Sequence, residues 1–574
     1  MRNFVFFIFC FTAFATVNAQ QWGLYTLYAP QNSTKAYLID TSDSPVTYKT
    51  WLFSSSAKTG YSTYLTQGDT IVRTVSSSVL GSPGQGGKTG KVQKVAWDGT
   101  LVWDFAYSSS TYCLHHDICP MPNGNVLMIS YEVKTTAEAV QAGCSSSISI
   151  WSEKIIEVRP TGATTGTIVW EWHLWDHLCQ NYNSEKDNYV TSIIQNPQLM
   201  NINYKTTQDW IHMNGIDYNV ELDQIALSSH CLNEVYVIDH STTTAEAAGH
   251  TGGNSGKGGD FLYRWGNPAS YGATGTTIFN VVHDAHWVSS DNPNYPDYLC
   301  AYNNKGGTGG KTCVDIWNPP ANGYNFDITL GSAYTPSTYE YRYNSSFSAR
   351  DLGNSEQLPN GNMLICNPMG AIYEINSSGT ILWTKTGANS PHAYRFTKCA
   401  VRGPIVTAGA SSMEISAGTE ATLSSSANSV SESSPTYSYS WSSEPSGFTS
   451  SSQNPSVTPA STTTYIVTIT NTDIDCSGTA SVTINVNATG IDKVNYPDNI
   501  SVFPNPTTGM IIVNGNFTKN DNFEILIYDI YGKMILHKIN SKTIDISGLR
   551  NGLYLFSVIS EKSNIFMQKI TLIK

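Results

Sequence analysis

Charged side chains are scarce in this sequence. Of its 574 residues, 13% are Asp, Glu, Lys or Arg, and the formal net charge is -12. The lysines and arginines nowhere gather into a basic block. Because phosphate binding needs clustered basic side chains, we expect no nucleic-acid partner.

Long apolar runs are also missing, apart from one at the start of the chain. Residues 4–14 are apolar, follow Arg2 and lead to the small residue Ala19. This run is too short to span a bilayer, and it is typical of a signal peptide cleaved after Ala19. We therefore expect residues 1–19 to be removed and the mature protein to be exported.

The sequence contains no Cys-x-x-Cys pair, the usual mark of a structural zinc site. It has 11 cysteines, and an even number remains once Cys10 is lost with the signal peptide. In an oxidising compartment several of them should be paired. Cys113 and Cys119 flank His115 and His116, so we predict a disulfide between them that stiffens this stretch. Ordinary buried thiols are the alternative.

Glycine and aromatic residues, in contrast, are abundant, with 45 Gly, 33 Tyr and 14 Trp. Between residues 20 and 403 a degenerate unit recurs, consisting of an apolar stretch that ends in Trp and a Pro-Asn-Gly-Asn turn suited to a tight hairpin. The Trp stretches are residues 99–103, 166–170, 261–265 and 379–383, and the turns begin at Pro122 and Pro359. A period of roughly fifty to sixty residues leaves room for about six units and predicts a six-bladed β-propeller. A β-sandwich or β-helix array is the alternative.

The remainder of the chain has a different composition. Residues 404–488 are rich in Ser and Thr and alternate in polarity, as in Tyr437-Ser-Tyr-Ser-Trp441, which predicts an immunoglobulin-like β-sandwich acting as a spacer. A linker, residues 489–499, leads to a small C-terminal β-sandwich, residues 500–574. The fold class is therefore expected to be all-β throughout.

This C-terminal segment carries Phe503-Pro-Asn-Pro-Thr507, Gly552-Leu-Tyr-Leu555 and a terminal Lys569-Ile570. With these elements it resembles the C-terminal sorting domain of the type IX secretion pathway of Bacteroidetes. The resemblance implies an interaction with that secretion machinery and passage across the outer membrane. Secretion or anchoring at the outer-membrane surface would follow.

Histidines recur at comparable places in the propeller units. The stretches are His115-His116-Asp117, His212-Met213-Asn214, Ser228-Ser229-His230 and His283-Asp284-Ala285-His286. Loops from equivalent positions in a propeller surround one axis, so we expect these histidines to converge there. Imidazole can serve as nucleophile, acid or base near neutral pH.

Two kinds of chemistry suit such a histidine set. A metal centre would use neutral imidazoles with carboxylates such as Asp117, Asp217 and Asp284, although no short ligand motif lies on one element. Covalent group transfer would use a neutral His to attack while other donors hold the oxygens of a sulfuryl or phosphoryl group. The net negative charge of the chain favours a singly charged sulfate ester over a polyanion.

Three ordered motifs resemble those of the bacterial arylsulfate sulfotransferases: residues 211–216 (Ile-His-Met-Asn-Gly-Ile), residues 225–235, and residues 283–287 (His-Asp-Ala-His-Trp). The resemblance spans most of residues 20–403. It implies a six-bladed propeller with its site at the central channel. It also implies transfer of a sulfuryl group from a phenolic sulfate donor to a phenolic acceptor through a sulfated histidine, without a nucleotide donor or other cofactor.

By motif, the resemblance makes His283 the histidine that is transiently sulfated and His116 a second site histidine. His212 and Asn214 match the family's His-x-Asn pair. His230 stands where the family has Arg after the Ser-Ser pair. Arg is always cationic and can hold two oxygens, whereas His is cationic only at acid pH, so transfer is expected to be slow, acid-shifted or aimed at another substrate unless another Arg substitutes. Arg395, near His392, is a candidate.

Other residues and functions carry less weight. His115, His286 and His392 are expected to have supporting or packing roles, and Trp210, Trp287, Tyr302 and Trp317 are expected in the core. A non-catalytic surface-binding propeller, a related sulfate-ester hydrolase and a His-ligated metal hydrolase remain as alternative functions.

Overall fold

The structure is a computed structural model, and it describes residues 21–66, 70–84, 86–429, 434–487, 500–515, 522–530, 532–560 and 565–574. The expected signal peptide, residues 1–19, and the expected linker, residues 489–499, lie outside these ranges. By their contacts the residues divide into two compact units. The larger holds residues up to 409 with 424–454 and 466–481, and the smaller holds 410–423, 455–465 and 482–574.

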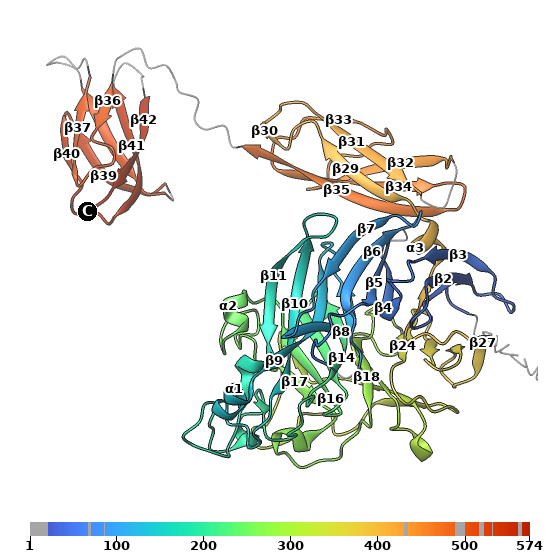
Figure 1. The fold of residues 1–574 in the computed structure, drawn as a ribbon. Helices are drawn as coiled ribbons and strands as arrows, with labels where there is room; N and C mark the ends of the chain where they lie inside the picture. The colour runs from blue at the N-terminus through green and yellow to red at the C-terminus, as the bar shows by residue number, and fades with distance from the viewer. Residues whose placement is uncertain are drawn as a thin grey trace, which may run out of the picture. The chain divides into compact units, whose positions relative to one another are not determined.

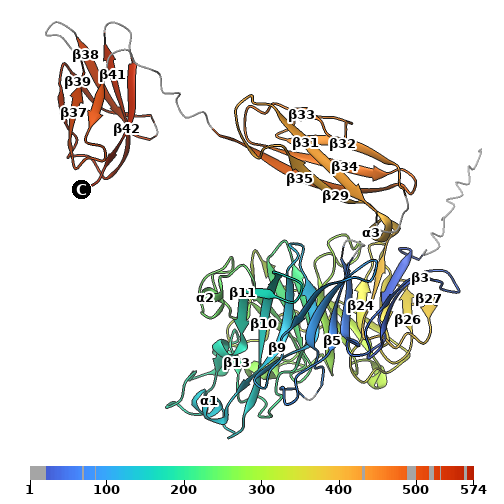
Figure 2. The same cartoon turned by 45° about the horizontal axis from the view of Figure 1, so that its top comes forward.

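The described residues between 21 and 396 form six four-stranded antiparallel sheets (Figures 1 and 2). In five of them the strands follow chain order: β4 to β7, β8 to β11, β14 to β17, β18-β19-β20-β23 and β24 to β27. The sixth has the order β28-β1-β2-β3 and joins the two ends of the region, with Tyr28 opposite Ala393. The all-β prediction is confirmed, and the arrangement is consistent with a β-propeller.

The strands of these sheets have the following bounds: β1 Tyr25–Tyr28, β2 Lys35–Asp40, β3 Thr47–Leu52, β4 Thr59–Thr66, β5 Thr70–Ser76, β6 Gly90–Ala96, β7 Leu101–Ala106, β8 Tyr112–Pro120, β9 Val126–Lys134, β10 Ile150–Pro160, β11 Gly166–His173, β14 Met213–Asn219, β15 Gln224–Ser229, β16 Glu234–Asp239, β17 Tyr263–Trp265, β18 Val282–Trp287, β19 Leu299–Asn303, β20 Cys313–Trp317, β23 Tyr341–Asn344, β24 Asn354–Gln357, β25 Met363–Cys366, β26 Ile372–Ile375, β27 Ile381–Lys385 and β28 Ala393–Phe396. The pairs β12 (Leu178–Cys179) with β13 (Met200–Asn201) and β21 (Ala321–Asn322) with β22 (Asn325–Phe326) lie in connections, as do the helices α1 (Thr136–Gln141), α2 (Thr244–Ala247), η1 (Leu174–His177), η2 (Ile193–Gln195), η3 (Pro268–Tyr271) and η4 (Thr308–Gly310).

The tryptophan of the sequence repeat lies on the fourth strand of its sheet each time and reaches the next sheet. Trp103 on β7 donates its indole N–H to the carbonyl of Thr165, between β10 and β11. Trp383 on β27 does the same to Ser42, between β2 and β3. The other tryptophans of this series are Trp51, Trp170 and Trp265, which donate to Ala96, Thr242 and Pro336 respectively. Because a buried indole must keep its N–H bonded, these contacts hold neighbouring sheets together.

The first strands of the sheets contact one another in series. β4 contacts β8, β8 contacts β14, β14 contacts β18, β18 contacts β24 and β24 contacts β28, and the series returns to β4 through β1, the strand paired with β28. Apolar residues fill the space between sheets, and the predicted core residues Trp210, Tyr302 and Trp317 are fully buried. Trp287 is only partly buried.

Two sheets follow in residues 405–487, β29-β31-β33 and β30-β35-β34-β32. Their strands are β29 Ile405–Ala410, β30 Glu414–Ser416, β31 Ala421–Asn428, β32 Tyr437–Glu444, β33 Ser456–Val457, β34 Thr463–Asn471 and β35 Cys476–Asn487. The alternating sequence appears as alternating burial along β34. The helix α3, Lys398–Arg402, precedes them.

The C-terminal residues also form two sheets, β36-β37-β40 and β39-β38-β41-β42. The bounds are β36 Ser501–Phe503, β37 Met510–Asn514, β38 Phe523–Tyr528, β39 Met534–Ile539, β40 Thr543–Asp545, β41 Gly552–Ser560 and β42 Ile565–Leu572. Ile511, Ile525 and Phe556 are fully buried in their shared core. No helix in the described part of the chain is long and apolar enough to cross a membrane.

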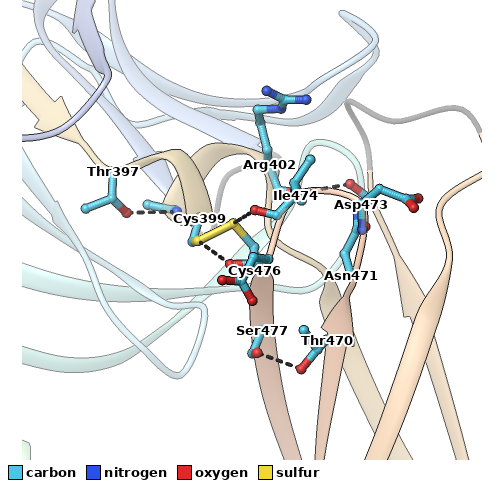
Figure 3. The surroundings of a disulfide bond; sticks show 12 residues. Thr397, Cys399, Arg402, Thr470, Asn471, Asp473, Ile474, Cys476 and Ser477 are labelled. Carbon is cyan, nitrogen blue, oxygen red and sulfur yellow. Dashed lines mark hydrogen bonds between the residues drawn. A yellow bond between two sulfur atoms is a disulfide. The ribbon is translucent and has the colours of Figure 1, made fainter.

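The predicted Cys113–Cys119 disulfide is wrong, because both thiols are free. Both residues lie on the single strand β8. Their partners on β9, Tyr131 and Leu127, are four residues apart, so at about 3.3 Å per residue the two cysteines are roughly 13 Å apart, beyond the reach of a disulfide. Cys399 of α3 is instead bonded to Cys476 of β35, with 5.1 Å between the Cα atoms (Figure 3).

Candidate active site

Three first strands are irregular at the places where the histidines stand. The pairing register shifts between Leu114 and Ile118 on β8, between Met213 and Gly215 on β14, and between His283 and His286 on β18. His116, His212 and Asp284 have positive φ angles of 49°, 55° and 53°. Bulges re-aim side chains, and positive φ is uncommon and costly outside glycine. The fold therefore holds these residues in special orientations.

Four histidines lie in a row, which we call the histidine row: His116, His212, His230 and His283. The ring centroids are 4.7 Å apart for the first pair, 5.3 Å for the second and 5.7 Å for the third. The convergence expected from the sequence repeat is thus present. His116 and His283 are buried, whereas the side chain of His230 keeps 31% of its exposure and opens the row to solvent.

His283 has both ring nitrogens engaged. Its Nδ1 lies 2.8 Å from Oδ1 of Asn304, and its Nε2 accepts the backbone N–H of Leu352 at 3.1 Å. Asn304 donates its Nδ2 to the Leu352 carbonyl, which fixes the orientation of the amide. His283 must therefore carry its proton on Nδ1 and its lone pair on Nε2. Burial, with a smaller effect of nearby His230, lowers the pKa of His283 to about 3, so the ring is neutral near pH 7.

His212 is oriented by a carboxylate and a phenol. Its Nδ1 lies 2.7 Å from Oδ2 of Asp209 and 2.9 Å from the hydroxyl of Tyr131. Asp209 can only accept, so the proton of His212 stands on Nδ1 and Nε2 is left for a ligand. Neither Asp209 nor Tyr131 is marked by a motif in the sequence.

His116 is linked to a buried partner. Its Nδ1 lies 3.0 Å from Nδ1 of His115, and Nε2 of His115 lies 2.8 Å from Oε2 of Glu153. The ring of His115 stacks on Tyr131 with 3.6 Å between centroids. Gly87 packs so closely on His116 that a Cβ there would fall 1.8 Å from the ring, and the positive φ of Gly87 also favours glycine.

Asn214 lies beside the row, with both the nitrogen and the oxygen of its amide hydrogen-bonded. Its Nδ2 donates to the Val282 carbonyl at 2.8 Å, and its Oδ1 accepts the Ser228 hydroxyl at 2.7 Å. The bonds tie the bulge of β14 to the start of β18. In this state Asn214 positions the strands that carry His212 and His283.

Arg395 does not replace the arginine that the sequence lacks after Ser228-Ser229. Its guanidinium donates to Glu374 and lies over Trp383 at 4.5 Å, where it is buried. A different arginine is linked to His230 through a carboxylate. Asp351 lies 3.8 Å from Nε2 of His230 and pairs with the exposed Arg350. No sequence motif marked Arg350.

The acidic residues considered as metal ligands join neighbouring sheets instead. Asp117 and Asp217 accept backbone N–H groups of Ile216 and Trp287, respectively. Asp284 accepts that of Ser355. His286 contacts Gln357, and His392 contacts Tyr394, which places both among packing contacts.

A group of residues outside the row brings possible metal ligands together. One ligand atom from each of His177, His250 and Asp260 lies within 4.8 Å of the other two. His177 belongs to η1, and the other two belong to the connection between α2 and β17.

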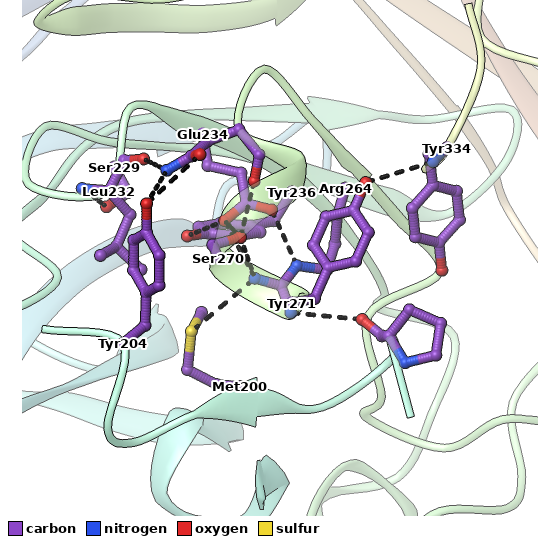
Figure 4. A network of polar contacts seen from close by, with 12 residues as sticks. Met200, Tyr204, Ser229, Leu232, Glu234, Tyr236, Arg264, Ser270, Tyr271 and Tyr334 are labelled. Carbon is purple, nitrogen blue, oxygen red and sulfur yellow. Dashed lines mark hydrogen bonds and ion pairs between the residues drawn. The ribbon is translucent and has the colours of Figure 1, made fainter. Parts of the chain in front are cut away.

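Glu234, part of the second resemblance stretch at residues 225–235, has a structural role. It forms a fully buried ion pair with Arg264 at 2.9 Å. Figure 4 shows the Arg264 guanidinium surrounded by Glu234, Ser270 and Met200. A buried Arg with this many partners fixes the sheet that carries His212 and His230.

Comparisons with known proteins identify two parts of the chain. A model of the arylsulfotransferase (ASST) family matches residues 86–396, and a model of the secretion system C-terminal sorting domain matches residues 501–573. A search of curated proteins returned no match.

Solved structures show only distant likeness. A putative 6-phosphogluconolactonase from Bacteroides fragilis is 12% identical, with 66% of this chain and 99% of that chain covered and a TM-score of 0.33. A nidogen/laminin complex chain is 6% identical, with 65% and 97% covered and a TM-score of 0.32. PorZ, a type IX secretion component of Porphyromonas gingivalis, is 8% identical, with 95% and 81% covered and a TM-score of 0.17. These scores are too low to carry an argument.

Proposed function

The chain belongs to the arylsulfotransferase family, and from this premise we propose that it moves a sulfuryl group from a phenolic sulfate ester to a phenolic acceptor through a sulfohistidine, without a nucleotide donor or cofactor. The observation that carries the proposal is the histidine row. Several differently held imidazoles within ring-contact distance can supply a nucleophile, an acid–base group and oxygen-binding donors at one place.

The proposed architecture is a closed six-bladed propeller followed by an immunoglobulin-like spacer and a small sandwich. The serial contacts of the first strands support closure, as does the pairing of β1 with β28. The indole of Trp383 gives further support, because it leads from the last sheet in the chain back to the first. The histidine row would then lie at the propeller axis, where bulged first strands from different blades meet.

In the first half-reaction, Nε2 of His283 attacks the sulfur of the donor. Asn304 holds the required tautomer, and low basicity keeps the ring unprotonated. The lone pair accepts Leu352 N–H in this structure, so that bond has to open when the donor binds. The N–S bond forms as the S–O bond to the phenol breaks, and the leaving oxygen takes a proton from Nε2 of His116.

The second half-reaction reverses these steps with another phenol. The acceptor hydroxyl gives its proton to Nε2 of His116, and its oxygen attacks the sulfur of the sulfohistidine. The N–S bond then breaks and its electron pair returns to His283. His230 donates a hydrogen bond to the sulfuryl oxygens in both halves, where charge is spread in the transition state. His212 directs its Nδ1–H to Asp209, so its Nε2 can donate to a sulfuryl oxygen only after taking up a second proton.

The sorting domain at residues 501–573 indicates export to the cell surface or secretion. A phenolic sulfate and a phenol, both small molecules, would then meet the enzyme outside the cytoplasm. This setting suits a transferase whose donor carries its own activated sulfuryl group and needs no intracellular nucleotide.

The test is sulfuryl transfer from 4-nitrophenyl sulfate to phenol by the mature protein, by His283→Ala and by His173→Ala. His173 is a matched control, because it lies on β11 and pairs with Glu132 outside the row. We expect transfer by the parent and the control, and a loss on the order of a thousandfold or more in His283→Ala. Mass spectrometry of the parent stopped with donor alone should find one added SO₃ group on the peptide that contains His283.

Four results would contradict the proposal. Transfer that persists in His283→Ala would remove the nucleophile from its role, and activity abolished by a chelator would favour a metal hydrolase. Release of sulfate with no transferred product would mean that water, not a phenol, is the acceptor. Binding of phenolic sulfates with no turnover would leave a binding propeller.

A further inference from the structure

Two fully buried polar side chains stand behind the histidine row and have no part in the steps above. Glu153 lies on β10 and His115 lies on β8, and neither side chain is exposed to solvent. Oε1 of Glu153 accepts the backbone N–H of Met213 at 2.9 Å, while Oε2 faces His115. Glu153, His115 and His116 therefore form a continuous hydrogen-bonded chain that ends in the row.

The chain can hold its protons in two arrangements. In the first, Glu153 is ionised and accepts Nε2–H of His115, while Nδ1 of His115 accepts Nδ1–H of His116. Nε2 of His116 then carries a lone pair. In the second, Glu153 is protonated and donates to Nε2 of His115, Nδ1–H of His115 donates to Nδ1 of His116, and Nε2 of His116 carries a proton. The arrangements differ by one proton overall.

We propose that Glu153 and His115 form a proton relay that acts through His116, with Glu153 holding the proton that the donor half-reaction uses and the acceptor half-reaction returns. The inference rests on the proposed function. Neither residue touches the substrate, and both serve to set the protonation of the nitrogen that does.

The protons balance in each half-reaction. When Nε2 of His116 gives its proton to the leaving phenolate, Nδ1–H of His115 moves to Nδ1 of His116 and the Glu153 proton moves to Nε2 of His115. Glu153 is left ionised. When the acceptor phenol gives its proton to Nε2 of His116, the same two transfers run backward and Glu153 is protonated again.

The surroundings favour the carboxyl group as the place where the proton rests. Burial raises the pKa of Glu153 well above its usual range, and burial together with His212 lowers the pKa of His115 and of His116 well below theirs. A neutral acid beside two neutral imidazoles costs less in a dry interior than an ionised acid beside an imidazolium. Nε2 of His116 has no hydrogen-bond partner among the described residues, so it is available to a ligand.

The test substitution is Glu153→Gln, with Glu157→Gln as the matched control. Glutamine keeps an oxygen for Met213 N–H and an N–H for His115, but it cannot release or regain a proton. Glu157 lies on the same strand and bonds His240 outside the row. Rates should be measured for sulfates of phenols that differ in acidity, from 4-nitrophenol to phenol, and circular dichroism should confirm that each variant folds.

We expect Glu153→Gln to keep most of its rate with 4-nitrophenyl sulfate, whose phenolate leaves without help. With phenyl sulfate it should lose about a hundredfold, the range of general-acid assistance, so the dependence of rate on leaving-group acidity steepens. Equal losses with all donors would mean a structural role and overturn the relay. If the parent transfers no sulfuryl group at all, the proposed function itself fails.

Infrared difference spectroscopy provides a readout that needs no turnover. The spectrum of the parent minus that of Glu153→Gln at pH 7 should contain the carbonyl band of a protonated carboxyl group, and this band should be missing from the Glu157→Gln difference. If the carbonyl band is absent from the parent minus Glu153→Gln spectrum, Glu153 does not hold the proton at pH 7, and the proposal fails for any substrate.

A second, independent arrangement lies away from the row, at His177, His250 and Asp260. Nδ1 of His177 lies 2.9 Å and Nδ1 of His250 lies 2.7 Å from the same oxygen, Oδ1 of Asp260. Nε2 of His177 lies 2.8 Å from the Ala247 carbonyl, an acceptor only, so that nitrogen carries a proton. The Nδ1 atoms of both histidines therefore converge on one carboxylate, with the three ligand atoms within 4.8 Å of one another.

Three such atoms lie close enough together to share one cation, and we infer that a divalent transition metal of the zinc class binds there. A ligand histidine whose other ring nitrogen donates to a backbone carbonyl is the usual support of such a site. The ring of His177 also lies parallel to that of Trp172, with 5° between the planes and 5.6 Å between the centroids. Two imidazoles and a carboxylate with one open position suit zinc, which would tie the glycine-rich connection after α2 to η1.

Zinc titration by calorimetry tests this site on mature protein first stripped with chelator. The parent should bind one more zinc ion than His250→Ala and should melt at a higher temperature with zinc than without, a gain that His250→Ala loses. His250 is exposed, so its removal spares the core, and His173→Ala is again the control. Equal zinc stoichiometry in the parent and His250→Ala would mean that a proton, not a metal, joins these residues.

Discussion

Asn304 holds His283 in one tautomer. Its Oδ1 receives the ring Nδ1–H at 2.8 Å, and its Nδ2 is bonded to the Leu352 carbonyl at 2.8 Å, so the amide cannot turn without losing both bonds. The lone pair of His283 is thereby placed on Nε2, the nitrogen nearest the Leu352 N–H.

Asn304→Leu should therefore weaken transfer without unfolding the protein. The ring of His283 loses its acceptor and populates the tautomer with the proton on Nε2, so kcat should fall about 10- to 100-fold, as for other groups that orient a reacting side chain. Asn304→Asp keeps an acceptor for Nδ1–H and should recover most of that loss. Steady-state kinetics of both variants provide the check, and equal losses in the two would show that the tautomer is not what Asn304 contributes.

The outer architecture could be foreseen because its signal is local. Trp103, Trp170, Trp265 and Trp383 each end an apolar stretch, and each stands on the fourth strand of a sheet. A period of this kind survives in the sequence since every unit must bury the same face. The disulfide could not be foreseen in the same way, because Cys399 and Cys476 are 77 residues apart and pairing depends on where distant strands meet.

The site was foreseeable only in part, for a similar reason. His116, His212, His230 and His283 stand in recognisable motifs, but the groups that orient them do not. Glu153 is 38 residues from His115, and Asn304 is 21 residues from His283. Which side chain faces which depends on the bulges of β8, β14 and β18, and one residue of register decides the face on which a side chain lies.

His230→Arg should restore the cation that the family motif carries. Unlike imidazole, an arginine keeps its charge from pH 5 to 9 and can hold two sulfuryl oxygens. Asp351 is close enough to orient the new side chain. We expect kcat/KM above pH 7 to rise by about tenfold, roughly one good charge-assisted hydrogen bond, and to depend less on pH. Profiles from pH 5 to 9 check this, and an unchanged profile would assign the cation role elsewhere.

If another residue supplies the cation that binds the sulfuryl oxygens, Arg350 is the candidate. It pairs with Asp351 and is mostly exposed. Arg350→Gln should then lower kcat/KM in the parent but have little effect in the His230→Arg background, since the new guanidinium would already supply the charge. Additive losses would show that the two positions act independently.

Folding stability should fall in acid partly because of His283. Its pKa is about 3 in the folded protein and about 6.5 in an unfolded chain. Between these values the unfolded state binds the extra proton, so this contribution is complete above pH 6.5 and is lost at about 1.4 kcal/mol per pH unit as the pH falls. Between pH 7.5 and 5 the free energy of unfolding of His283→Gln should therefore drop by about 2 kcal/mol less than that of the parent.

His173 provides a control of opposite sign. Burial opposes its charge, but the bond to Glu132 and the negative charges of Glu132 and Glu171 together outweigh burial and raise the pKa of His173 above its ordinary value. The stabilisation that charged His173 provides is present in acid and is lost as the pH rises. Between pH 7.5 and 5 the free energy of unfolding of His173→Gln should therefore fall by more than that of the parent. Urea titrations at the two pH values measure both effects. If the free energy of unfolding falls equally in the parent, His283→Gln and His173→Gln, the assigned protonation of His283 is contradicted.

The disulfide should matter for stability and not for transfer. It joins α3 to β35 across 77 residues, and closing a loop of this length lowers the entropy of the unfolded chain by an amount worth about 4 kcal/mol at 25 °C. The double variant Cys399→Ser with Cys476→Ser should therefore unfold at a lower urea concentration, and a reducing agent should shift the midpoint of the parent but not that of the variant. Its kcat should stay unchanged, because the residues that hold the histidine row lie between 87 and 352.

Cys231→Ser, which removes a free thiol, is the control and should leave the sensitivity of the urea midpoint to reducing agent intact. A parent midpoint that does not respond to reducing agent would mean that the two sulfurs are not bonded in the secreted protein.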